Sequence, residues 1–119
     1  MKPETIKIDE VEYVRKDAVP EVNAENYAIV RSTNAGVFAG EIAEKNLAAG
    51  WVKMTRVRRI WYWSGAASLS QLAADGVSNP GNCKFSVPVA EQMVLGVCEI
   101  IPCTNKAIKC IAEVKPWKA

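Results

Sequence analysis

The side chains best suited to recognising a small charged ligand lie in one dense cluster: Arg56, Arg58, Arg59, Trp61, Tyr62 and Trp63. Arginine forks bind phosphate and carboxylate groups, and aromatic faces stack on flat bases. The cluster is a local feature, because the whole chain has 15 basic and 13 acidic residues and a formal charge of +2. That balance argues against a protein that neutralises many phosphates along a DNA duplex.

Apparatus for catalysis is missing from the sequence. There is no histidine, which excludes Ser-His and Cys-His nucleophile pairs and histidine-ligated metals. Four carboxylates in the second half of the chain form no paired motif: Asp75, Glu91, Glu99 and Glu113. The cysteines are spaced unlike zinc ligands, and we expect reduced thiols that are mostly buried: Cys83, Cys98, Cys103 and Cys110. We therefore predict a binding protein without catalytic residues, cofactor or metal.

The cluster falls in a segment rich in β-branched and aromatic residues, 51–63, which predicts a strand. In an unbroken strand, Arg59, Trp61 and Trp63 share one face with Val57, and Arg58 lies on the other face with Ile60 and Tyr62. Two interpretations stay open for this strand. The tryptophans belong to the core with an arginine at its edge, or they form a ligand-binding face with the arginine.

A turn at Ser64-Gly65 follows the strand, and Ser68 and Gln71 match a capping box at the start of a helix predicted over 66–75. The first turn of a helix offers unpaired N–H groups and the positive end of its dipole to an anion. The turn and helix start therefore favour a phosphate-binding corner. Ser68 capping its own helix is the structural alternative, and the two uses are compatible.

The remaining pattern predicts an α+β fold with an antiparallel β-sheet core. Expected strands cover 27–32, 36–42, 84–89 and 93–101, and Pro88 indicates that the third of these lies at an edge. A second helix is expected over 104–113, with Lys106 on its exposed side. Residues 1–26 are predicted to form an N-terminal hairpin and linker, and 27–119 the binding domain. We find neither a membrane span nor a secretory signal, and expect a cytosolic protein.

Three stretches of the sequence carry a family resemblance: 57–73, 82–89 and 99–107, with the string WYWSGAASLSQL at 61–72 the densest part. They resemble a family of phage and prophage anti-Thoeris proteins, the first such family described. Members of that family are sponges, which sequester cyclic ADP-ribose isomers without destroying them, and some also hold cyclic di- or trinucleotides. The chain departs from the family at Thr33-Asn34, where the family has a tyrosine-serine pair.

The resemblance implies inhibition of Thoeris, and for some members of CBASS, in the host cytoplasm. It also implies a homo-oligomer, a dimer or a trimer of dimers. The ligand-binding residues expected from it and from the pattern are Arg58, Arg59, Trp61, Trp63, Ser64, Gly65, Ser68, Phe85 and Lys106. Trp61, Trp63 and Phe85 are expected to stack on bases. The alternative is a phage structural or host-factor-binding protein whose Arg/Trp face is a protein interface.

Overall fold

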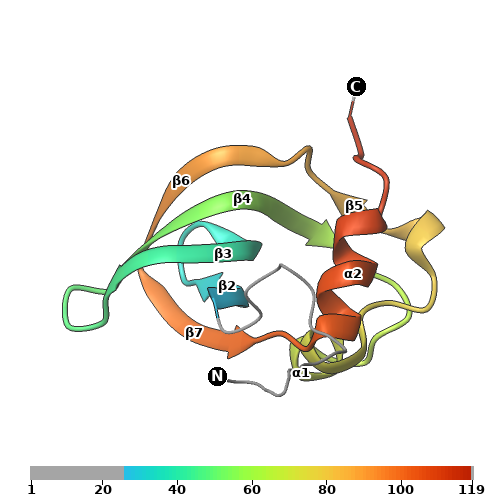
Figure 1. Ribbon diagram of the computed structural model, residues 1–119, viewed down its shortest axis with the longest axis horizontal. Helices are drawn as coiled ribbons and strands as arrows, with labels where there is room; N and C mark the ends of the chain where they lie inside the picture. Colours follow the sequence, from blue (N-terminus) through green and yellow to red (C-terminus); the bar gives the residue numbers. More distant parts are fainter. Residues whose placement is uncertain (1–25, 119) are drawn as a thin grey trace, which may run out of the picture.

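The computed structural model describes residues 26–118, which form one curled antiparallel sheet with two α-helices at one end (Figure 1). The elements follow in the order β2 (Tyr27–Ser32), β3 (Gly36–Asn46), β4 (Trp51–Tyr62), α1 (Leu69–Asp75), the 3-10 turn η2 (Pro80–Asn82), β5 (Lys84–Phe85), β6 (Val89–Leu95), β7 (Val97–Pro102) and α2 (Asn105–Glu113). None of the helices described is long and apolar enough to cross a membrane.

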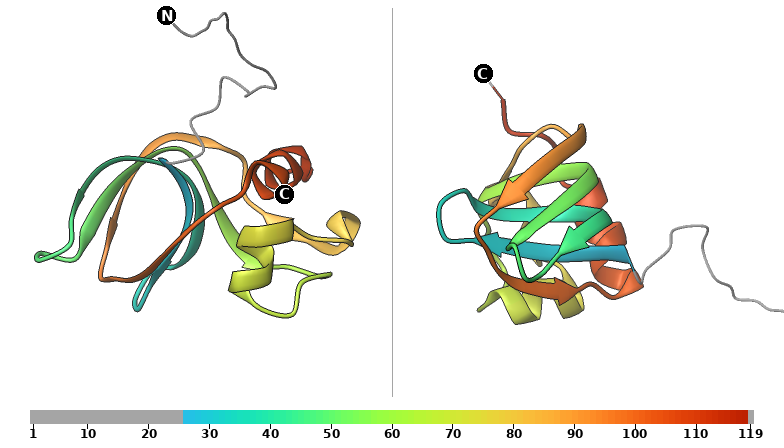
Figure 2. Two further views of the ribbon diagram at one scale, coloured as in Figure 1. Left: turned by 60° about the horizontal axis from the view of Figure 1, so that its bottom comes forward. Right: turned by 90° about the vertical axis from the view of Figure 1, so that its left-hand side faces the viewer.

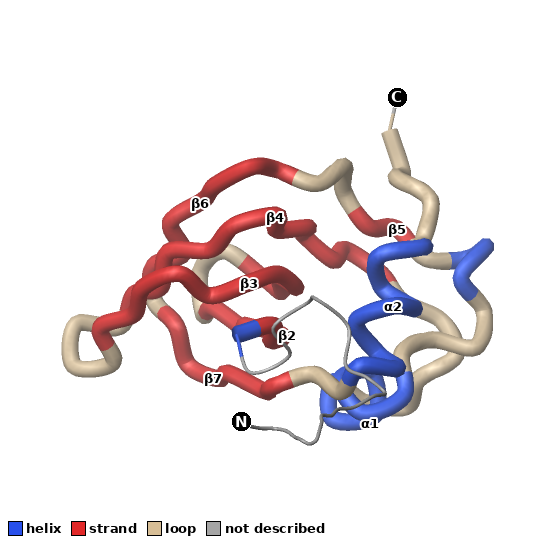
Figure 3. The backbone as a smooth tube through the Cα atoms, viewed as in Figure 1, coloured by secondary structure: helices blue, strands red, loops and turns tan. Residues whose placement is uncertain are grey.

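The sheet curls back on itself. Its strand order is β5-β4-β3-β2-β7, and β6 pairs with the first half of β4. Strands β6 and β7 are consecutive parts of one ribbon that bends at Gly96, whose φ of 68° few other residues tolerate. At this bend the Gly96 carbonyl accepts a hydrogen bond from Thr33 N, and Val97 N donates to Gly50 O. The ribbon therefore joins both sides of the sheet at one end, as Figures 2 and 3 show.

A bulge in the middle of the β3–β4 pair redirects β4. The register shifts between Ala39 and Glu41 on β3, and Arg56 opposite has a φ of 48°. Gly40 permits a very close approach, since a Cβ there would lie 2.8 Å from the Cα of Val57. Bulges bend a strand and re-aim the side chains that follow. The arginines after position 56 are placed by this bulge.

The helices are fixed by caps and by one apolar face each. The Ser68 hydroxyl accepts from Gln71 N, and Gln71 Oε1 accepts from Ala67 N, so the predicted cap is present. The Thr104 hydroxyl accepts from Ala107 N and donates to Ala74 O, which ties α2 to α1. Two apolar cores result. One lies between the sheet and the helices, and the other lies inside the curl around Phe38 and Met54.

The α+β class, the antiparallel sheet and both helices are confirmed. Several boundaries need correction. Helix α1 begins at Leu69, β5 has only two residues, and the strand expected over 93–101 begins at Val89 and is broken by Gly96. Glycine with a positive φ ends a regular strand, which is the physical reason for that break. The expected hairpin over 5–19 lies outside the described residues.

Candidate functional site

Arg58 and Arg59 lie on opposite faces of β4, because successive strand residues point to opposite sides. Arg58 is only 3% exposed and faces the helices, with its guanidinium 5.4 Å from the centre of the Phe85 ring. Burial lowers the pKa of Arg58 below its usual value. Arg59 lies over Phe38 on the other face, 4.8 Å from the ring centre, and its Nε has no hydrogen-bond partner among the described residues. The two arginines therefore cannot both contact one compact ligand from the same face of the sheet.

An exposed aromatic pair lies beyond Arg59. Trp61 and Trp117 are 53% and 51% exposed, and their rings meet edge to face with centroids 5.5 Å apart. The Lys84 ammonium lies 5.0 Å from the centre of the Trp117 ring. Arg59 precedes Trp61 by two positions on β4. We call Arg59, Trp61, Lys84 and Trp117 the aromatic-cationic surface.

The C-terminal tail completes this surface. Pro116 bridges to Phe85 in a parallel arrangement, and Trp117 N donates to the Phe85 carbonyl at 2.8 Å. These contacts extend the sheet beyond β5 and hold the Trp117 ring against Trp61. A hollow of about 440 Å³ opens beside the tail, lined by Pro80, Gly81, Cys83, Glu113, Lys115, Pro116 and Trp117. Its volume lies within the range of small-molecule pockets, about 300–1,000 Å³.

Two of the aromatic residues expected to stack on bases are placed in the helix-side core instead. Phe85 is fully buried, and Trp63 packs against the same cluster. The register of β4 against β5 shifts between Ile60 and Tyr62, so the simple alternation that would keep Trp63 beside Arg59 fails there. Of the three residues assigned to stacking, the structure leaves Trp61 with an open face.

Several polar groups of the turn after β4 form hydrogen bonds within the protein. Ser64 Oγ accepts from Asn79 Nδ2, and the Gly65 carbonyl accepts from Ser78 N. The Ser68 hydroxyl is the N-cap of α1, and the Ala67 N–H is taken by Gln71. The geometry therefore gives Ser64 and Ser68 structural roles, and a phosphate at this corner stays a prediction.

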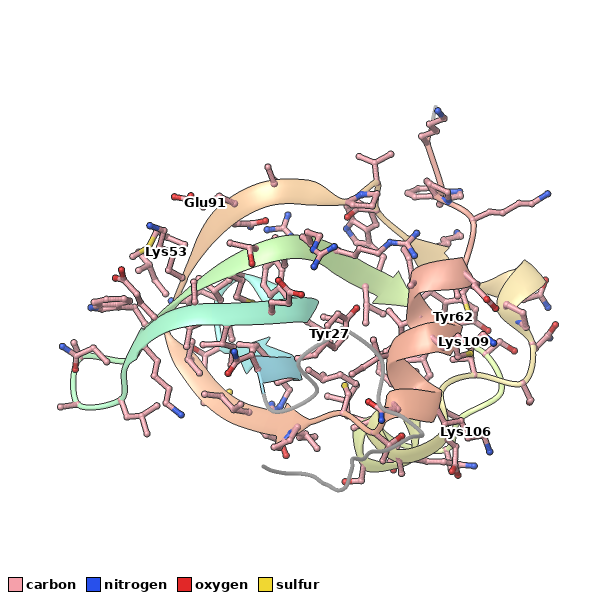
Figure 4. All side chains as sticks on the ribbon, in the orientation of Figure 1. Tyr27, Lys53, Tyr62, Glu91, Lys106 and Lys109 are labelled. Atoms are coloured by element: carbon pink, nitrogen blue, oxygen red, sulfur yellow. The ribbon has the colours of Figure 1, made fainter. Side chains whose placement is uncertain are left out.

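Gly65 and Lys106 come together at a separate place. Both line a shallow hollow of about 320 Å³ between α1 and α2, with Gln71, Asp75, Gly76, Val77 and Ser78. The Lys106 ammonium lies 3.8 Å from Asp75 Oδ1 and is well exposed, as its position on α2 in Figure 4 illustrates. The predicted residues thus divide among the aromatic-cationic surface, the helix-side core and this hollow.

Sequence reasoning missed Trp117 and Lys84 as members of the site. Lys84 enters the sequence analysis only as the first residue of the strand expected over 84–89. Their approach depends on the tail pairing with β5, a contact between residues 31 positions apart (Phe85 and Pro116). The one local signal for a charged surface in the tail is that Pro116 and Trp117 lie between two lysines, Lys115 and Lys118.

The fold and these contacts define a small α+β protein with a curled antiparallel sheet and an exposed aromatic-cationic surface. The chain belongs to the family described as Domain of unknown function (DUF6948), whose model matches residues 25–111. Searches of curated proteins and of solved structures returned no match. Within residues 26–118 no three His, Cys, Asp or Glu side chains are grouped so that they could hold a metal ion.

Proposed function

We propose that this protein is a phage-encoded sponge that binds cyclic nucleotide immune signals in the host cytoplasm and leaves them chemically intact. The signals are cyclic ADP-ribose isomers such as glycocyclic ADP-ribose, and their sequestration inhibits Thoeris. Cyclic di- and trinucleotides of CBASS are a second ligand class for the same activity. The sequence resemblance to the anti-Thoeris family is the source of this ligand class.

The aromatic-cationic surface is the observation that supports the proposal best. A cyclic dinucleotide-like ligand presents flat bases and at least two phosphate charges. This surface offers two half-exposed indoles in contact, one ammonium against them, and the guanidinium of Arg59 two positions before Trp61 on β4. The hollow beside Trp117 has room for a ligand of that size. Base stacking contributes about 1–3 kcal/mol per base, and aromatic rings do not discriminate strongly among bases.

Sequestration requires several contacts to act together. Nanomolar affinity corresponds to about −12 kcal/mol, far more than one stacked ring supplies. Trp117 lies in the C-terminal tail and is half exposed, so a second subunit could cover its open side and add contacts to a ligand in the hollow. We therefore propose that the active form is a homo-oligomer with pockets completed where subunits meet.

The test uses the purified full-length protein and cyclic ADP-ribose isomers in isothermal titration calorimetry and thermal unfolding. We expect saturable binding heat, a melting temperature that rises with the logarithm of ligand concentration, and recovery of the unchanged ligand after heat denaturation. Trp61→Ala and Trp117→Ala should each weaken binding about fivefold or more. Trp51→Ala is the matched control, because Trp51 lies at the opposite end of β4. Turnover of the ligand, or affinity unchanged in both site variants, would contradict the proposal.

A protein interface is the second candidate function for the same surface. Tryptophan and arginine are enriched at the cores of protein interfaces, and half-exposed indoles are suited to that role. A structural or host-factor-binding phage protein would show no stabilisation by any cyclic nucleotide. Its Trp61→Ala variant would instead lose a protein partner in a pull-down while keeping its melting temperature.

A further inference from the structure

Arg58 is a buried cation that has no carboxylate partner in the part of the chain that the structure describes. It points to the helix side of β4, where its partner across the strand pair is the small, fully buried Ala39. Its Nε donates to Ser86 O at 2.8 Å and its Nη1 to Ile111 O at 2.7 Å. Its Nη2 is buried and has no hydrogen-bond partner within residues 26–118. An arginine at this depth normally has every donor occupied.

The groups around Arg58 supply dipoles in place of a counter-charge. The Ile111 carbonyl belongs to the last turn of α2, whose dipole provides about half a negative charge. Among residues 26–118 no carboxylate lies within ion-pair distance of Arg58. A buried charge without a partner costs several kcal/mol. The arrangement therefore favours an additional anion beside the guanidinium.

A cavity is present where such an anion would bind. It has a volume of about 180 Å³ and is lined by Tyr27, Glu41, Arg56, Arg58, Pro88, Ile108 and Ala112. That volume is below the size of nucleotide pockets, about 300 Å³ and more, and suits one small charged group. Burial raises the pKa of Tyr27 to about 12, so its phenol is neutral near pH 7 and can donate a hydrogen bond.

The charged groups that line this cavity have an excess of positive charge. Arg56 and Arg58 contribute two cations and Glu41 one anion. Glu41 is already held by Arg56 Nη2 at 2.8 Å and by the Thr55 hydroxyl at 3.1 Å. Arg56 has a left-handed backbone with φ of 48°, which costs about 1–3 kcal/mol for a residue of its type. Such strain often accompanies a functional position, and here it places a second cation at the cavity.

We infer that this cavity is a binding site for a small oxyanion, a phosphoryl or carboxylate group, held by Arg58 with Tyr27 and Arg56. The site lies on the opposite face of β4 from the aromatic-cationic surface. It is therefore separate from the proposed nucleotide-binding surface, and its existence does not depend on that function. The anion is either a free ion or the terminal group of a larger molecule.

The experiment measures thermal unfolding and isothermal titration of the full-length protein with sodium phosphate, against sodium chloride at equal ionic strength. We expect phosphate, but not chloride, to raise the melting temperature with the logarithm of its concentration, by about 5 °C at ten times its dissociation constant. A titration with ribose 5-phosphate distinguishes the two sources of the anion. If ribose 5-phosphate binds more tightly than inorganic phosphate, the natural ligand is a phosphoryl group on a larger molecule. If it binds equally or more weakly, the natural ligand is the free ion.

Three variants assign the effect to this cavity. Tyr27→Phe and Arg56→Gln should each weaken phosphate binding about tenfold, as expected for loss of one hydrogen bond to a charged group. Both keep the buried guanidinium, so their folding does not rest on replacing Arg58. Arg31→Gln, at an exposed arginine on β2 that pairs with Glu99 and lines neither site, should leave phosphate binding unchanged. Stabilisation no larger than that of chloride, or equal phosphate affinity in all three variants, would overturn the inference.

Discussion

Adjacent arginines have different physical surroundings in this protein. The guanidinium of Arg58 is enclosed between Phe85 and α2, whereas that of Arg59 lies over Phe38 at the edge of the inner core. Replacing Arg58 leaves buried carbonyls without donors, so a loss of stability accompanies any loss of binding. Among the described residues, the Nε of Arg59 donates no hydrogen bond, so replacing Arg59 breaks no hydrogen bond of that atom. A loss of ligand affinity in an Arg59 variant is therefore easier to distinguish from a loss of stability.

We predict that Arg59→Gln lowers the affinity for cyclic ADP-ribose isomers about tenfold or more, because a charge-assisted hydrogen bond contributes about 1.5–3 kcal/mol. Its melting temperature without ligand should change little. Calorimetric titration gives the dissociation constant, and Arg31→Gln is the control, since Arg31 is an exposed arginine paired with Glu99 on the β7 side of the sheet. A folded Arg59→Gln protein with unchanged affinity would remove Arg59 from the site.

We also predict a loss of stability at alkaline pH. Burial raises the pKa of the Tyr27 phenol from 10.0 to about 12 and that of the Cys103 thiol from 9.0 to about 12. The folded protein therefore holds these protons more tightly than the unfolded chain does. The contribution is fully present below about pH 9 and is lost as the pH rises toward 12.

The measurement is urea unfolding of the wild type and of a Tyr27→Phe, Cys103→Ala double variant at pH 7.5 and 11. The double variant should lose less of its own free energy of unfolding between these two pH values. Lysines deprotonate alike in both proteins, so they cancel in the comparison. Equal losses in the two proteins would contradict the assignment to Tyr27 and Cys103.

At the scale of elements, the sequence predicts the strands and helices well and the directions of their side chains less well. Turn residues around Thr33 and the capping box at Ser68 are local signals, and both predict what is found. The bulge at Arg56 and the register shift after Ile60 arise from contacts with β3 and β5. Non-local contacts of this kind leave no periodic signature, which is why Trp63 was expected on the wrong face.

The junction between α1 and α2 offers a test of an element boundary. Gly76 ends α1 with a φ of 78°, and a Cβ at this position would lie 2.5 Å from Cys110 Cβ. Gly76→Ala should therefore reduce the free energy of unfolding by about 2 kcal/mol or more, from backbone strain and overpacking together. Gly81→Ala is the control, since nothing lies within 4 Å of a Cβ there and its φ is not positive. Chemical denaturation gives the free energy of unfolding of both variants. Equal stability of the two would show that α2 shifts to accommodate the new methyl group without loss of stability.

At the scale of the whole molecule, the outer face of β6 is the best candidate for contact with a second copy of the chain. Val89, Met93 and Leu95 alternate along it and are all exposed. Glu91 lies between them, 3.5 Å from Lys53 on β4, and both are labelled in Figure 4. A face that carries both signs of charge beside apolar side chains is complementary to itself, as a two-fold dimer requires.

We predict a dimer for the wild type and a monomer for a Met93→Glu, Leu95→Lys double variant, because two charges in an apolar interface are costly to desolvate. Light scattering coupled to size-exclusion chromatography at micromolar concentration measures the mass. Leu47→Lys is the control, as Leu47 is exposed in the β3–β4 turn and not on β6. A monomeric wild type would contradict the prediction, and a dimeric double variant would move the interface elsewhere.

The closure of the sheet at Gly96 has a consequence for synthesis of the protein. Strand β2, near the start of the described chain, pairs with β7, which is complete only at Pro102. Until the ribosome has made β7, one edge of β2 has no partner among the described residues, and the inner core lacks Val97 and Ile100, both from β7. Open strand edges invite pairing with other chains. A nascent chain stalled before residue 97 is therefore an aggregation hazard, and productive folding begins only when translation of the domain is almost finished.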